Sequence, residues 1–351
     1  MRVKLGDVCE RGSSNLKHSD VVELKGDYPI YGASGYIGNV DFYHQENSYV
    51  AVVKDGAGIG RTTLLPAKSS IIGTMQYLLP KDNVLPEYLY YVVSYMHLEK
   101  YFTGATIPHI YFKDYKNEEF NLDSVDKQRK IVDVLGKCES VIELRKNELQ
   151  LLDNLIKARF VELFGEPEHN TKGLPTDTLG NLCSVGSSKR IYKSEQTMEG
   201  IPFLRISDLV NLIDSGTLKS DLNISEECYS ELVYQGQVPV AGDILVTSRG
   251  TLGRCYIVGS DDRFYFQDGM ISWLSNLSSS ITPLYVSFLF SMEGFRKQID
   301  KMQAGSTVSY LSITMLKKLE IMIPSSELQE LFAAFVAQVD KSKFDEFHIH
   351  K

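Results

Sequence analysis

Residues Asp126–Phe164 read DKQRKIVDVLGKCESVIELRKNELQLLDNLIKARFVELF, and this stretch decides how the rest of the chain is organised. It contains no proline, and Gly165-Glu166-Pro167 ends it. Apolar residues recur with a seven-residue period, which predicts a long helix that pairs with another helix as in a coiled coil. At 1.5 Å per residue the helix would be about 57 Å long. The alternative, an ordinary core helix, is disfavoured by this length. The seam positions are Gln128, Ile131, Leu135, Cys138, Ile142, Arg145, Leu149, Leu152, Ile156, Arg159 and Leu163.

Working outward from this helix, landmarks that precede it recur after it in the same order. An ordered set of repeated landmarks predicts an internal duplication, with loop insertions between the shared parts. The paired landmarks are Leu5-Gly6-Asp7-Val8-Cys9 with Leu179-Gly180-Asn181-Leu182-Cys183, Val53–Arg61 with Thr247–Arg254, Gly104–Ile110 with Gly305–Leu311, and Gln128 with Gln329.

Each half of the repeat contains a strand-rich body followed by helical segments. Short β-type runs end in glycine turns, and two stretches that begin at a proline read as helices, Pro86–Tyr101 and Pro283–Met302. The second half ends in a shorter apolar-periodic segment, Ser326 to about Phe347. We therefore predict a mixed α+β fold with two tandem α/β domains separated by long helices. The expected boundaries are 1–122, 123–165, 166–322 and 323–351.

Composition excludes several classes of protein. The 351 residues are 43% hydrophobic and 23% charged, which is typical of a globular protein. The net charge of −8 argues against binding nucleic acid by bulk positive charge alone. No apolar run approaches the roughly 20 residues of a membrane span, and no signal sequence is visible. The five cysteines form no Cys-x-x-Cys pair, so we expect neither a disulfide framework nor a zinc site, and a cytoplasmic location.

Motifs for catalysis are missing from the sequence. It has no Gly-x-x-x-x-Gly-Lys-[Ser/Thr] phosphate loop and no Pro-Pro pair of the kind found beside the flipped base in DNA amino-methyltransferases. Gly56-Ala57-Gly58-Ile59-Gly60 imitates a cofactor loop, but the repeated segment Arg249–Gly253 lacks the pattern. We therefore expect no catalytic residue, no metal site and no cofactor bound by this chain.

The ordered repeat resembles the specificity subunit of type I restriction–modification enzymes. The resemblance covers nearly the whole chain, and the set of motifs in tandem order carries it rather than any single motif. Besides the helix, the matching motifs are Leu5-Gly6-Asp7-Val8, Tyr28-Pro29-Ile30-Tyr31-Gly32, Gly104-Ala105-Thr106-Ile107-Pro108, Ile201-Pro202-Phe203-Leu204-Arg205, Gly242-Asp243-Ile244-Leu245, Ser248-Arg249-Gly250 and Phe332–Phe344.

The resemblance implies a pseudo-two-fold protein for defence against foreign DNA in a bacterial or archaeal cytoplasm. Each α/β body would be a target recognition domain that reads one half of a bipartite site in double-stranded DNA. The long helices would form an antiparallel coiled-coil spacer. Two modification (methyltransferase) subunits and the restriction/motor subunits would assemble on the chain. S-adenosylmethionine, ATP and Mg would then be bound by those partner subunits and not by this chain.

Three groups of residues are candidates for DNA contact. Basic residues bracket the two glycine turns, where arginine could bind guanine through a bidentate fork and lysine could bind phosphate. A basic loop at Ser187–Lys193 and aromatic or imidazole side chains after the Gly104 turn and its repeat complete the set. The alternatives are solvated charges or internal ion pairs for the basic residues, and packing for the rings. The candidates are Lys54, Arg61, His109, Tyr111, Lys189, Arg190, Lys193, Arg249, Arg254 and Tyr310.

The candidates for pairing between the long helices are the apolar seam residues. They are Leu135, Ile142, Leu149, Leu152, Ile156 and Leu163 in the first helix, and Phe332, Phe335 and Val339 in the second. The second helix reaches only to Lys351, which is shorter than the partner that the resemblance implies. A truncated or inactive specificity subunit, or an antirestriction decoy, is therefore an alternative. A solitary DNA methyltransferase or nuclease is a further alternative, which would need a cofactor or metal site.

Overall fold

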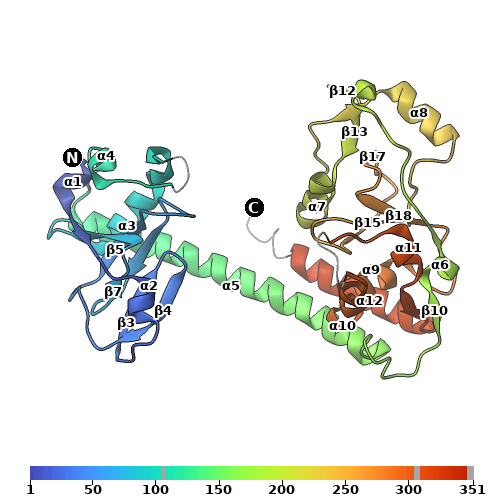
Figure 1. The fold of residues 1–351 in the computed structure, drawn as a ribbon, viewed down its shortest axis with the longest axis horizontal. Coiled ribbons are helices and arrows are strands. Elements are labelled where there is room, and N and C mark those ends of the chain that lie inside the picture. Colours follow the sequence, from blue (N-terminus) through green and yellow to red (C-terminus); the bar gives the residue numbers. More distant parts are fainter. Residues whose placement is uncertain (105–107, 304–308, 346–351) are drawn as a thin grey trace. The chain divides into compact units, whose positions relative to one another are not determined.

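The computed structural model describes residues 1–104, 108–303 and 309–345, and it contains two compact units, Met1–Arg145 and Lys146–Lys351. The boundary between the units, after Arg145, falls within one continuous helix, α5 (Val125–Phe164), which is drawn in green in Figure 1. The helix begins one residue before the predicted start and ends at the predicted residue, where Gly165 adopts a left-handed φ of 82°. Parts of the Gly104 segment, of its repeat and of the C-terminal helix lie outside the described residues.

The first unit is built on two sheets with the orders β2-β8-β5-β6 and β4-β3-β7. Strand β5 is buried at all five positions because it lies between two neighbours, and its valines suit such a strand. The strands are β1 (Arg2–Lys4), β2 (Cys9–Ser13), β3 (Tyr28–Gly32), β4 (Gly35–Val40), β5 (Tyr49–Val53), β6 (Thr62–Leu65), β7 (Ser70–Ile71), β8 (Met75–Pro80) and β9 (Glu119–Asn121). The helices that precede α5 are α1 (Leu5–Val8), α2 (His18–Val21), α3 (Pro86–Tyr95), η1 (Leu98–Tyr101) and α4 (Phe112–Tyr115).

The second unit repeats this plan with the sheets β11-β18-β15-β16 and β12-β14-β13-β17. The second sheet named for each unit contains one parallel pair, β3 with β7 and β13 with β17, so the duplication extends to topology. The strands are β10 (Thr176–Thr178), β11 (Ser184–Gly186), β12 (Gln196–Thr197), β13 (Ile201–Leu204), β14 (Asn223–Ile224), β15 (Ile244–Thr247), β16 (Cys255–Ile257), β17 (Tyr265–Phe266), β18 (Ile271–Ser275) and β19 (Glu320–Met322). The helices are α6 (Leu179–Leu182), η2 (Lys193–Glu195), α7 (Ile206–Ser215), α8 (Glu226–Tyr234), α9 (Pro283–Ser291), α10 (Glu293–Gln303), α11 (Ile313–Lys317) and α12 (Ser326–Asp345).

The prediction of one continuous helix after each proline was wrong. In the first unit α3 ends, His97 adopts a left-handed φ of 51°, and η1 follows. In the second unit the extended residue Met292 separates α9 from α10. The break brings the next helical segment against the glycine turn, where a Cβ on Gly60 would lie 2.6 Å from the backbone nitrogen of Glu99. Close packing at this point requires both the break and the glycine.

A buried glutamine fixes the first turn of each long helix. The Gln128 side chain accepts a hydrogen bond from the Leu85 N–H and donates to the Asn83 and Asp123 carbonyls, each at 2.9 Å. Gln329 does the same in the second unit: it accepts from the Thr282 N–H at 2.8 Å and donates to the carbonyls of Ser280 and Pro324. Gln128 therefore joins its helix to the loop before α3 and is not an exposed seam position.

Helix α12 lies antiparallel along the C-terminal part of α5 within the second unit. The rings of Phe332 and Phe160 are 5.5 Å apart, and Lys343 reaches Asp153 at 2.9 Å, so residue numbers fall along α5 as they rise along α12. The predicted antiparallel pairing is thus present. Of the predicted residues, it buries Ile156, Phe332 and Val339 and partly covers Leu152, Leu163 and Phe335.

The predicted pairing does not extend along the rest of α5 in the described structure. Leu135, Ile142 and Leu149 are 37%, 54% and 38% exposed. The reason is the reach of the partner helix, since Lys343, near the described end of α12, contacts Asp153. The N-terminal half of the seam therefore presents an apolar surface.

Candidate nucleic-acid interface

The glycine turn of the first unit connects β5 to β6. Gly56, Gly58 and Gly60 have φ angles of 86°, 85° and 81°, a region that L side chains rarely adopt. The Gly60 N–H donates to the Val53 carbonyl and the Val53 N–H donates to the Arg61 carbonyl, both at 2.9 Å, which closes the turn. The Arg61 guanidinium folds over Gly58, where a Cβ would lie 2.2 Å from one of its nitrogens.

This turn is joined to the segment that follows the Gly104 turn. The Ile110 N–H donates to the Lys54 carbonyl at 2.9 Å, and the Gly56 N–H donates to the Pro108 carbonyl at 3.0 Å. Asp55 Oδ1 lies 2.7 Å from His109 Nδ1. The described parts of two segments that sequence analysis selected separately thus form one surface; residues 105–107 of the second segment lie outside the described residues.

The second unit builds the same backbone arrangement with different side chains. The Gly253 N–H donates to the Thr247 carbonyl at 2.9 Å, and the Leu311 N–H donates to the Ser248 carbonyl at 3.0 Å. Where the first unit pairs Asp55 with His109, the second places the Arg249 guanidinium 4.9 Å from the centre of the Tyr310 ring. A guanidinium on an aromatic face is attracted by the ring and keeps its in-plane donors exposed.

Arg61 and Arg249 are the candidate arginines whose charge stays available. Both are exposed, and neither has a carboxylate within ion-pair distance among the described residues. Arg61 lies beside a small hollow of about 110 Å³ that the turn between β3 and β4 helps to line. Both arginines bracket glycine turns, as sequence analysis proposed.

Three other candidate cations lie beside carboxylates; for Lys54 and Arg254 an internal ion pair was the alternative to DNA contact. Arg254 makes a double contact with Asp214 of α7, one hydrogen bond being 3.0 Å long, and this contact lowers the pKa of the Asp214 carboxyl. Arg190 pairs with Asp268 at 2.8 Å. Lys54 lies 3.2 Å from Asp55. Their charges are thus partly neutralised within the chain.

The remaining candidates lie on exposed surfaces. Lys189 is exposed and its Nζ is 3.4 Å from the Gln235 side-chain oxygen, while Lys193 begins η2. Tyr111 is 48% exposed and its ring lies nearly parallel to that of His109. Lys113, which sequence analysis missed, places its ammonium 5.4 Å from the centre of the Tyr111 ring. A single lysine after an aromatic residue carries no distinctive pattern, and the fold of the loop brings the two together.

The described ranges hold neither a candidate metal site nor a candidate membrane span. No group of three or more His, Cys, Asp or Glu residues there could hold a metal ion. Among the helices that the structure describes, none is both long and apolar enough to cross a membrane.

Comparison with known proteins decides the family. The model of the type I restriction modification DNA specificity domain matches residues 1–154 and again residues 173–347, one match for each half of the repeat. The chain belongs to this family. As a type I specificity subunit it is a DNA-recognition component of a restriction–modification system.

Individual relatives of this specificity subunit are distant. A Haemophilus influenzae protein, named as a candidate type I restriction enzyme specificity subunit, is 24% identical over 311 residues, which are 86% of this chain and 77% of that protein. The MjaIX specificity subunit of Methanocaldococcus jannaschii is 25% identical over 288 residues, which cover 74% of this chain and 63% of that subunit. The crystal structure of the S subunit from M. genitalium is similar in fold, with a TM-score of 0.61, 16% identity, and coverage of 98% of this chain and 90% of that chain.

Proposed function

We propose that this specificity subunit reads a bipartite DNA site, one half-site with each unit, and positions methyltransferase and restriction/motor subunits on it. The observation that carries this proposal is the repeated glycine turn, which has one backbone arrangement and two different sets of side chains. In this account the chain itself catalyses nothing. S-adenosylmethionine, ATP and Mg are bound by the partner subunits.

The two turns offer different chemistry to a DNA groove. Arg249, held against Tyr310, and Arg61 each present a planar set of donors that fits the O6 and N7 acceptors of guanine. At the position of Arg249, the first unit has the carboxylate of Asp55, which accepts hydrogen bonds such as those from the cytosine amino group. Two different readers suit an asymmetric site rather than a palindrome.

The charge distribution favours a phosphate clamp that the partners supply. The net charge is −8, and Lys54, Arg190 and Arg254 are paired with carboxylates. Affinity for DNA depends strongly on the number of phosphates that lysine and arginine neutralise. We therefore expect the isolated chain to bind DNA weakly at physiological salt. Nanomolar binding of the isolated chain to its site would contradict this part of the proposal.

The test is a methylome. The chain is expressed with the modification subunit from its own source in a host that lacks DNA methylation, and modified bases are mapped by single-molecule sequencing. We expect a split motif, with two short defined halves separated by a fixed unspecified spacer. An undivided motif would contradict two separate readers. The absence of any motif, with both proteins folded, would favour an inactive subunit or decoy.

A further inference from the structure

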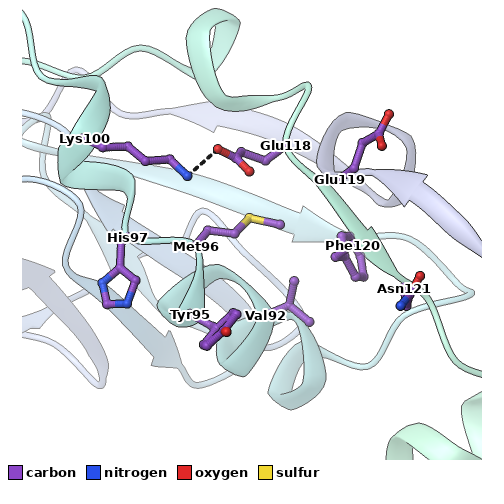
Figure 2. Close-up of a pocket in the computed structure, with 9 residues that line it drawn as sticks. All are labelled: Val92, Tyr95, Met96, His97, Lys100, Glu118, Glu119, Phe120 and Asn121. Atoms are coloured by element: carbon purple, nitrogen blue, oxygen red, sulfur yellow. Dashed lines mark ion pairs between the residues drawn. The ribbon is translucent and has the colours of Figure 1, made fainter.

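A pocket of about 630 Å³ opens in the first unit where the end of α3, η1 and β9 meet (Figure 2). No candidate DNA contact lies in it, so the proposed reading of DNA leaves it unexplained. It is lined by Val92, Tyr95, Met96, His97, Lys100, Glu118, Glu119, Phe120 and Asn121.

The backbone of Glu119 meets this pocket with its hydrogen-bonding groups open. Met1 and Leu122 exchange two hydrogen bonds, of 2.9 and 2.8 Å, at the end of the antiparallel pair β1–β9. Because bonded and non-bonded pairs alternate along such a ladder, the N–H and C=O of Glu119 point away from β1. No described residue supplies a hydrogen bond to them. The next outward carbonyl, that of Asn121, accepts from the Tyr88 hydroxyl at 3.0 Å.

The second unit closes the equivalent edge with its own side chain. Glu320 of β19 occupies the matching register, and the Met322 carbonyl accepts from the Tyr285 hydroxyl as Asn121 does from Tyr88. Gln298 of α10 accepts a hydrogen bond from the Glu320 N–H at 3.1 Å and donates to the Glu320 carbonyl at 3.3 Å. One planar amide thus satisfies both backbone groups. The first unit has η1 in place of the longer α10.

The charges around the pocket are already paired with one another. Lys100 forms an ion pair with Glu118, drawn as a dashed line in Figure 2, with a distance of 2.5 Å. The side chain of Glu119 lies 2.7 Å from Arg2. His97 lies 3.3 Å from Glu99. The features of the pocket that lack a partner are therefore the N–H and C=O of Glu119 and an apolar wall.

That wall continues to the surface. Val92, Met96 and Phe120 line the pocket, and the neighbouring Tyr95 is 84% exposed. An uncharged ligand that carries an amide group between apolar flanks fits these features. A charged ligand would instead have to compete with the existing ion pairs for the charged side chains around the pocket.

We propose that this pocket binds an extended, uncharged segment of a partner protein, whose main-chain amide pairs with the N–H and C=O of Glu119 as the Gln298 carboxamide pairs with Glu320. Such strand addition takes affinity from main-chain hydrogen bonds and specificity from adjoining side-chain pockets. The inference rests on the proposed function, because the partner used to test it is the modification subunit. The partner segment would then bind only the first unit, because Gln298 covers the matching edge in the second.

The experiment compares two substitutions of one residue in the full-length chain. Glu119→Pro removes the outward N–H, and proline is tolerated on an edge strand when that group faces away from the ladder. Glu119→Ala keeps the N–H and removes the same ion pair with Arg2. Binding to the modification subunit from the same source is measured by isothermal titration calorimetry. We expect about a tenfold higher Kd for Glu119→Pro and a Kd within about twofold of wild type for Glu119→Ala.

A second variant keeps the inference testable if the proline variant does not fold. Val92→Trp fills the pocket from α3 without substituting a residue of β9, and it should also raise the Kd about tenfold. If the wild-type chain binds the subunit but Glu119→Pro and Glu119→Ala have equal Kd values, only this inference is overturned. An unchanged Kd for Val92→Trp overturns it in the same way. Failure of the wild-type chain to bind the subunit overturns the proposed function, and this inference with it.

Discussion

In the first unit, the turn after β5 holds Asp55 against His109, whereas in the second unit the turn after β15 holds Arg249 against Tyr310. The backbones that carry these pairs are hydrogen-bonded alike, through Ile110 to Lys54 in one unit and Leu311 to Ser248 in the other. The scaffold has therefore been kept through duplication while the side chains at its outer surface have diverged.

The arginines at the two turns show the same divergence. Arg61 and Arg254 stand at matching positions, just after the last glycine of each turn. Arg61 is free of ion pairs within the described residues, but Arg254 is held by Asp214 of α7. The second unit instead exposes Arg249. Each turn thus presents an available guanidinium from a different position, so the two units should contact guanine at different positions of their half-sites.

The largest effect is expected for the buried glutamines. Gln128→Ala and Gln329→Ala each leave one backbone N–H and two carbonyls without their partner. Each substitution should lower the free energy of unfolding by about 2–4 kcal/mol, measured by urea titration. The comparison predicts losses of similar size in the two units. A large loss at one glutamine and none at the other would show that the two positions are not equivalent.

The next effect concerns DNA binding by the assembled methyltransferase complex. Arg61→Ala and Arg249→Ala should each weaken binding to the specific site by about 1–3 kcal/mol, as for loss of a bidentate contact to guanine. Fluorescence anisotropy with specific and mutated duplexes measures this. Arg254→Ala is the matched control on the same turn, and its specific affinity should stay within about twofold. Equal losses for Arg249→Ala and Arg254→Ala would remove the distinction between free and paired arginines.

A smaller effect is expected for the ring beneath Arg249. Tyr310→Leu keeps apolar contact with the guanidinium but removes the attraction of the aromatic face. The specific affinity of the complex should fall by about 0.5–1 kcal/mol, in the same anisotropy assay. The corresponding change in the first unit, His109→Leu, removes no cation–ring contact; it removes the contact with Asp55 and the ring that lies beside Tyr111. An effect of Tyr310→Leu as large as that of Arg249→Ala would mean that the ring itself contacts DNA.

Sequence alone was sufficient for features that depend on local pattern. The heptad period predicted α5 almost to the residue, and the glycine turns identified the surface on which Arg61 and Arg249 lie. Pairing over long sequence distances was not predictable. The Arg254–Asp214 contact joins residues 40 positions apart, and no periodicity marks it.

The breaks near His97 and Met292 were missed for a different reason. Their local sequences favour a continuing helix, and the need to pack against the glycine turns overrides that preference. Likewise, Gln128 fits a heptad position by spacing, yet the polar groups of a neighbouring loop determine its role. The open edge at Glu119 became visible only beside the second unit, where Gln298 covers the matching edge.

If α5 connects two independent readers, shortening this helix should change only the distance between their half-sites. Deleting residues 140–146, one heptad that is exposed along its whole length, shortens α5 by about 10 Å and turns its two ends relative to each other by only about 20°. The decisive measurement is the methylome of this variant with the modification subunit. We expect both half-site sequences to stay the same while the spacer between them changes by about three base pairs. An unchanged spacer, or altered half-sites, would contradict this expectation.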